Sequence, residues 1–211
     1  MMLALALLLL VVSALAAFAM SEHRKRRELE RERSIRAYVF PTAVLEQLVV
    51  AYPHLGPKDY HLAARALRQF FLVHLRAGSG LVTMPSKAAD TLWHAFILDT
   101  QAYSDFCQEA FGAYFHHIPP QAMGNRDDNG QATWRTWRLA CLEENINPDN
   151  ATRLPLLFAL DAKLGIPGAV EHDPGSFKRP ESASGSCGGG GSSGRDSDGD
   201  GGGDGGGCGG D

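Results

Sequence analysis

Apolar side chains recur along the middle of the chain at the three- and four-residue intervals of an amphipathic helix. Pro and Gly interrupt this spacing, and the interruptions predict helices over residues 42–52, 57–78, 86–97, 99–112, 133–145 and 154–166. No stretch alternates β-branched and polar residues in the way that a half-buried strand requires. The pattern therefore predicts an all-α fold, a bundle of about five to six helices.

The third and fourth of these helices carry the clearest apolar stripes. The stripe on the third helix consists of Ala89, Leu92, Trp93, Phe96 and Ile97. Fourteen residues later the same spacing recurs as Tyr103, Phe106, Cys107, Ala110 and Phe111. Ser86 is the expected N-cap of the third helix, and Gly112 is expected to end the fourth, which Asp99 or Thr100 caps.

The first 20 residues contain no charged side chain. As a helix, this segment would reach about 30 Å, the thickness of the hydrocarbon core of a bilayer. We therefore expect a transmembrane helix over residues 1–20, followed by a charged juxtamembrane helix over residues 21–37. A cleavable signal peptide is the alternative, because the A-F-A sequence at residues 17–19 has the small-x-small form of a cleavage site.

The charges that follow this segment predict its orientation. Residues 21–36 carry seven Arg or Lys residues against four Glu, and no basic residue precedes the apolar run. Because Lys and Arg near a membrane segment stay on the cytoplasmic side, we expect a single-pass protein with its N-terminus outside and its folded domain in the cytoplasm. In that reducing compartment the four cysteines would be thiols or metal ligands.

The C-terminal part of the chain has a different composition. Residues 185–211 contain fifteen glycines, five aspartates and one arginine. Such a segment buries too little apolar surface to offset its ordering entropy, so we expect residues 171–211 to be a disordered tail and residues 38–170 to be the helical domain. The residues before this tail are close to neutral in sum, which gives no reason to expect nucleic-acid binding.

Asp196, Asp198, Asp200 and Gly201 in this tail fit the first positions of a calcium-binding loop. The twelfth position, which should be a bidentate Glu, is Gly207. The spacing therefore excludes an EF-hand.

The segment from Asp90 to His117 holds the residues with the richest chemistry. Asp90 and His94 are four residues apart and lie on one helical face, where a carboxylate can orient an imidazole. Cys107 lies on the facing helix, and His116 and His117 follow Gly112 closely enough to fold back. The sequence therefore nominates His94, Cys107, His116 and His117 as metal ligands of the kind that Zn²⁺ favours, with Asp90 in the second shell.

Two other interpretations of this segment stay open. A cysteine on an apolar stripe often acts as a small buried hydrophobe, and no C-x-x-C pair supports a zinc site, so the residues can be structural. A Cys-His pair can also be nucleophile and base, but burial disfavours the thiolate that this chemistry needs. The pattern therefore favours packing or binding over catalysis.

The segment resembles the glycine-rich domain-containing protein family, which includes plant proteins and membrane-anchored bacterial proteins with Gly/Cys tails. The matching residues are Asp90, Trp93, His94, Tyr103, Phe106, Cys107, Gly112 and His117. The chain departs at Phe96, where related sequences often carry a second histidine. Because the family has no settled activity, the resemblance implies a fold and a layout without a mechanism.

Two functions follow as expectations. The first is a membrane-anchored, cytoplasm-facing helical module that binds a partner protein or an ion. The second is a metal sensor or an enzyme that uses the residues nominated above.

Overall fold

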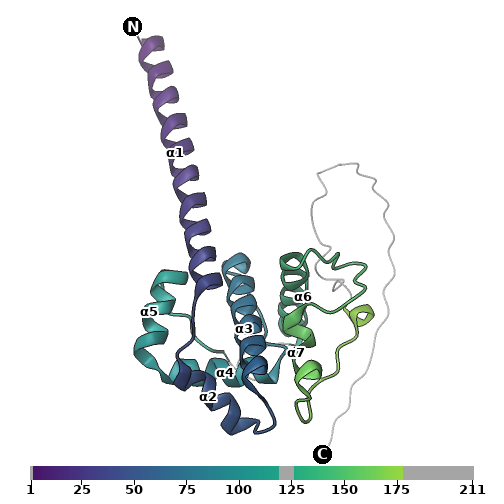
Figure 1. The fold of residues 1–211 in the computed structure, drawn as a ribbon. Helices are drawn as coiled ribbons and strands as arrows, with labels where there is room; N and C mark the ends of the chain where they lie inside the picture. The colour runs from purple at the N-terminus through teal and green to yellow at the C-terminus, as the bar shows by residue number, and fades with distance from the viewer. Residues whose placement is uncertain (1, 119–125, 178–211) are drawn as a thin grey trace, which may run out of the picture.

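The computed structural model describes residues 2–118 and 126–177, and for residues 2–8 and 126–129 it describes the backbone alone. Seven α-helices and one short 3₁₀ helix follow one another in this part of the chain, which contains no strand (Figure 1). The helices are α1 (Met2–Ala37), α2 (Thr42–Ala51), α3 (Pro57–Ala77), α4 (Lys87–Leu98), α5 (Thr100–Ala110), α6 (Arg126–Glu143) and α7 (Leu156–Leu164), and the 3₁₀ helix is η2 (Pro174–Ser176). The all-helical expectation agrees with this architecture.

Helix α3 is the centre of the bundle. It packs against α1, α2, α4, α6 and α7, while α5 lies against α1 and α4. The N-terminal part of α1 projects away from the other helices (Figure 1). The core is rich in aromatic side chains, and its largest fully buried members are Trp137, Tyr103, Phe70, Phe71, Phe96 and Phe106.

The ends of α4 and α5 follow the local signals in the sequence. The Ser86 hydroxyl accepts a hydrogen bond from the Ala89 amide at 3.1 Å, and the Asp99 carboxylate accepts one from the Ala102 amide at 3.4 Å. Gly112 ends α5 with a φ of +76°, and a Cβ there would lie 2.5 Å from an Arg31 nitrogen. Glycine is therefore favoured at this turn for its backbone conformation, whereas the Arg31 side chain could move to make room for a Cβ.

The predicted transmembrane anchor is wrong. Among the described residues, no helix combines the length and the apolar character that crossing a bilayer requires. The single-pass topology, with the N-terminus outside and the domain in the cytoplasm, rested on this anchor and is wrong for the same reason.

The C-terminal end of α1 is part of the bundle. Ile35 is fully buried, and Arg76 of α3 donates a hydrogen bond to Glu32 of α1 at 3.0 Å. Arg36 and Arg76 both pair with Glu143 of α6, so one carboxylate joins three helices. The domain boundaries drawn from composition stay a prediction, and the disordered tail lies almost wholly outside the described residues.

A carboxylate from α7 caps the first turn of α4. Asp161, which is 4% exposed, accepts hydrogen bonds from the Lys87 amide at 2.7 Å, the Ala88 amide at 3.1 Å and the Ser86 hydroxyl at 2.6 Å. Ser86 and Asp161 together therefore satisfy the first amides of α4, which otherwise have no partner within the helix. These contacts fix the helix that carries Asp90 and His94.

Candidate metal centre

Three potential metal ligands converge where α4 meets the segment that follows α5. Asp90 and His94 lie one turn apart on α4, and His117 comes from the extended segment after Gly112. The ligand atoms of these residues all lie within 4.8 Å of one another. The Nε2 atom of His117 is 3.1 Å from one carboxylate oxygen of Asp90, and the two imidazole rings have their centroids 4.4 Å apart.

A hydrogen bond orients the imidazole ring of His94. Its Nδ1 atom lies 2.9 Å from the backbone oxygen of Asp90. A carbonyl oxygen only accepts, so Nδ1 donates this bond. The same nitrogen lies 3.4 Å from a carboxylate oxygen of Asp90. This arrangement is common for ligating histidines, because the bond to the carbonyl fixes the ring and its tautomer.

A chain of hydrogen bonds holds the segment that carries His117. The indole N–H of Trp93 donates to the hydroxyl of Tyr103 at 3.1 Å, and this hydroxyl donates to the backbone oxygen of Phe115. Burial raises the pKa of Tyr103 far above its usual value, so the phenol keeps the proton that it donates. These two hydrogen bonds connect α4 and α5 to Phe115, which lies two residues before His117. They hold the backbone next to His117 against the bundle.

Aromatic stacking fixes the same segment from the side of α3. The ring of Phe115 lies between His74, with centroids 3.6 Å apart and an interplanar angle of 12°, and Trp93, with centroids 5.0 Å apart. Burial lowers the pKa of His74 to about 4, which keeps this imidazole neutral at physiological pH. His74 therefore acts as an uncharged aromatic wall.

The structure places two of the nominated ligands away from this cluster. Cys107 is fully buried in the core, and burial raises the pKa of its thiol although interactions with the Phe115 backbone and the Tyr103 side chain act in the opposite direction. His116 is exposed and lies beside the ring of Tyr114, with centroids 4.9 Å apart. The described residues thus bring together His94 and His117 of the nominated set. Asp90, assigned to the second shell, lies between them as a direct candidate ligand.

A cavity of about 490 Å³ adjoins the cluster. Asp90 and His117 line it together with the aromatic side chains of Phe70, Trp93 and Phe115. This volume is in the range of small-molecule sites, which are mostly apolar with a few convergent polar groups. A larger hollow, of about 1160 Å³, lies along α3 and α7 and includes none of the cluster residues.

The comparison with protein families concerns the same part of the chain. A family model described as UCP032817-like matches residues 30–190, which include α2 to α7 and the whole cluster. The match covers well over half of the chain. The chain belongs to the UCP032817-like family. No curated protein and no solved structure matches it.

Membership in the UCP032817-like family carries no activity in its description, so the function has to be argued from the site. The resemblance to glycine-rich domain-containing proteins stays a prediction. The sequence did not single out His74, Phe115 or Asp161, which position the cluster. In the sequence, His74 is one histidine on an apolar helix, Phe115 is one more aromatic residue near His117, and Asp161 is an acid within an apolar run. None of these features distinguishes a positioning residue.

Proposed function

We propose that this domain binds a divalent transition-metal ion, of which Zn²⁺ is the best match, through Asp90, His94 and His117. The observation that carries the proposal is the convergence of one carboxylate and two imidazoles within 4.8 Å from two separate segments of the chain. Two imidazoles and one carboxylate form a ligand set used by catalytic zinc sites, which leave one position open for water or a ligand.

Hydrogen bonds around the three candidate ligands support the proposed metal site. His94 has one ring nitrogen fixed by a carbonyl, and the Trp93–Tyr103–Phe115 chain fixes the segment of His117. Ligating residues in proteins are usually held by such outer hydrogen bonds. In the metal-free protein, the Nε2 proton of His117 bonds to Asp90, and an ion bound by both residues would replace that proton.

The adjoining cavity indicates what such an ion would serve. Asp90 and His117 belong to the cluster and also line the cavity. An ion that they bind would therefore lie at the edge of an aromatic-walled space of about 490 Å³. A small molecule with an apolar body and one nitrogen, oxygen or sulfur donor fits this combination. The proposal is therefore a metal-dependent binding site for a small molecule.

Calorimetric titration of metal-free protein with ZnCl₂ tests the metal site. The full chain should carry Cys187→Ser and Cys208→Ser, because these two cysteines lie outside the described residues and a thiolate is itself a zinc ligand. We expect one ion per chain, and His94→Gln and His117→Gln should each weaken the affinity at least about tenfold.

Two control variants make the result specific. His116→Gln removes the neighbouring imidazole, which is exposed and outside the cluster, and should leave the affinity unchanged. Cys107→Ser should also leave it unchanged, because the buried thiol is not in the cluster. The absence of stoichiometric binding, or an equal loss in His116→Gln and His117→Gln, would contradict the proposal.

A further inference from the structure

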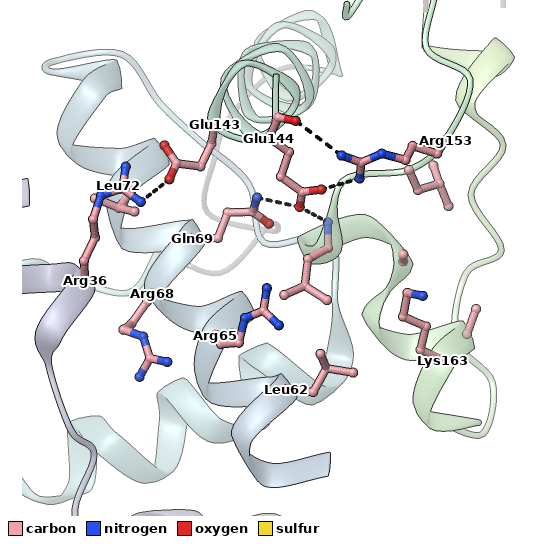
Figure 2. A pocket seen from close by; sticks show the side chains of 14 residues that line it. Arg36, Leu62, Arg65, Arg68, Gln69, Leu72, Glu143, Glu144, Arg153 and Lys163 are labelled. Atoms are coloured by element: carbon pink, nitrogen blue, oxygen red, sulfur yellow. Dashed lines mark hydrogen bonds and ion pairs between the residues drawn. The ribbon is translucent and has the colours of Figure 1, made fainter. Parts of the chain in front are cut away.

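A second feature, distinct from the metal centre, is the hollow of about 1160 Å³ whose walls come mainly from α3, the end of α6 and α7. Figure 2 shows Arg65 of α3 and Lys163 of α7 on its two sides, with Glu143 and Glu144 at one end. We call this hollow the basic groove, and its charged lining residues are Arg36, Arg65, Arg68, Arg153, Lys163, Glu143 and Glu144.

Both glutamates of the basic groove are already engaged. Glu143 pairs with Arg36 and Arg76. Glu144 pairs with Arg153 and accepts hydrogen bonds from the Gln69 amide at 3.0 Å and from the backbone N–H of Leu156. Burial alone would raise the pKa of Glu144, but these hydrogen bonds outweigh it and hold the pKa below its usual value. Both acids are therefore already paired with cations of the fold.

Three cations of the groove have no acidic partner among the described side chains. Within residues 9–118 and 130–177, no carboxylate forms an ion pair with Arg65, Arg68 or Lys163. Arg68 donates to the backbone oxygen of Tyr38 at 3.0 Å. Its pKa is lowered by burial and then by the like charge of Arg65, one turn away on α3. The groove therefore presents positive charge that the described side chains leave uncompensated.

The same chain carries a segment of the opposite charge. Five aspartates and no cation lie in residues 196–211, which are outside the described residues. We propose that the basic groove docks this aspartate-rich end of its own chain, with aspartates between Asp196 and Asp204 beside Arg65 and Lys163.

The place where the described chain ends supports this assignment. The ring of Phe177, the last described residue, packs on Phe158 of α7 with centroids 5.0 Å apart. The next residue of α7, Ala159, lines the basic groove. Residues 178–195 span at most about 65 Å when extended, which is ample to pass around one short helix. Intramolecular attachment also raises the effective concentration of the acidic end, commonly into the millimolar range.

The docked segment offers the groove charge and almost no apolar surface, since glycine fills most of the remaining positions. Individual exposed ion pairs contribute about 0–1 kcal/mol, so the contact depends on several charges acting together. Raising the salt from 0.1 to about 0.5 M shortens the screening length well below its value of about 10 Å and should release the segment.

Zero-length carbodiimide coupling of the full chain, followed by tryptic digestion and mass spectrometry, tests the docking. At low salt, Lys163 should form an amide with an aspartate of residues 196–204. The yield should fall at least about fivefold in 0.5 M NaCl and by a similar factor in Arg65→Gln. Arg138→Gln, which removes an exposed arginine of α6 outside the groove, should leave the yield unchanged.

A mixture of ¹⁴N- and ¹⁵N-labelled chains distinguishes the occupants. Coupled peptides of a single isotope support docking within one chain, whereas peptides of mixed isotope would show that a second copy supplies the acidic segment and would overturn the proposal. Coupling of these aspartates to Lys58 or Lys87 as readily as to Lys163 would also overturn it, as would an unchanged yield in Arg65→Gln.

Discussion

The imidazole of His74 illustrates how a single residue is changed by its surroundings. It stacks on Phe115 with ring centroids 3.6 Å apart and lines the cavity next to the cluster. Burial lowers its pKa to about 4, whereas the same group in the unfolded chain titrates near 6.5. The unfolded state therefore binds a proton that the folded state rejects, and stability should fall as the pH drops through this window.

His74→Phe should reduce that loss of stability at low pH. The variant keeps an aromatic ring against Phe115 but cannot bind a proton. Between pH 6.5 and 4, the free energy of unfolding of the wild type should fall by about 2–3 kcal/mol more than that of the variant. Urea unfolding at a series of pH values measures the difference. The exposed His61→Phe is the control and should keep the wild-type slope; a parallel loss in the His74 variant and the wild type would contradict the assignment.

At the scale of elements, α4 depends on a side chain from α7. Asp161→Ala would leave the amides of Lys87 and Ala88 and the hydroxyl of Ser86 without their buried acceptor. Loss of a buried, charge-assisted network of this kind should lower the free energy of unfolding by about 3 kcal/mol. Denaturant unfolding measures the effect, and Asp149→Ala, at an exposed position, should change stability by less than about 0.5 kcal/mol.

The segment after α5 depends in the same way on the Tyr103 hydroxyl. Tyr103→Phe removes both the acceptor of the Trp93 indole and the donor to the Phe115 carbonyl. We expect a loss of about 1–3 kcal/mol of stability and, because His117 is two residues further on, at least about tenfold weaker zinc affinity. Tyr114→Phe is the matched control, since Tyr114 is 42% exposed. Unchanged zinc affinity in Tyr103→Phe would show that the hydrogen bonds of Tyr103 do not position His117 for the metal.

At the scale of the whole molecule, Glu143 joins α1, α3 and α6. Its carboxylate is 10% exposed and pairs with Arg36 and Arg76, and Arg76 also pairs with Glu32. Glu143→Gln should lower the free energy of unfolding by about 2 kcal/mol, because it leaves two guanidinium groups with less compensation. Hydrogen exchange should also become faster at the C-terminal end of α1. Glu46→Gln, at an exposed site on α2, should do neither.

The ends of α4 and α5 could be predicted because they depend on local chemistry, whereas α6 begins at Arg126, seven residues before the predicted start. Ser86, Asp99 and Gly112 act on amides and carbonyls within a few residues of themselves, so their roles follow from spacing. The transmembrane expectation rested on the lack of charge in residues 1–20. It was wrong, because no helix among the described residues has both the length and the apolar character that a bilayer requires.

The make-up of the cluster depended on which side of each helix faces the core. Cys107 is fully buried, whereas the His94 side chain is 54% exposed, so these two residues do not meet. Helical spacing places both residues near the apolar stripes. It does not say which of the two side chains is buried and which is exposed. The contribution of Asp161 was unpredictable for another reason, because it depends on packing between helices that are far apart in the sequence.

The cap of α4 by Asp161 also has a consequence for the order in which the protein is completed on the ribosome. Asp161 follows Ala88, whose amide it accepts, by 73 residues. At the usual translation rate of about 5–20 residues per second, α4 emerges roughly 4–15 s before its capping carboxylate does. A nascent chain that already contains Asp90, His94 and His117 therefore still has an open first turn on the helix that carries two of them, until synthesis reaches α7.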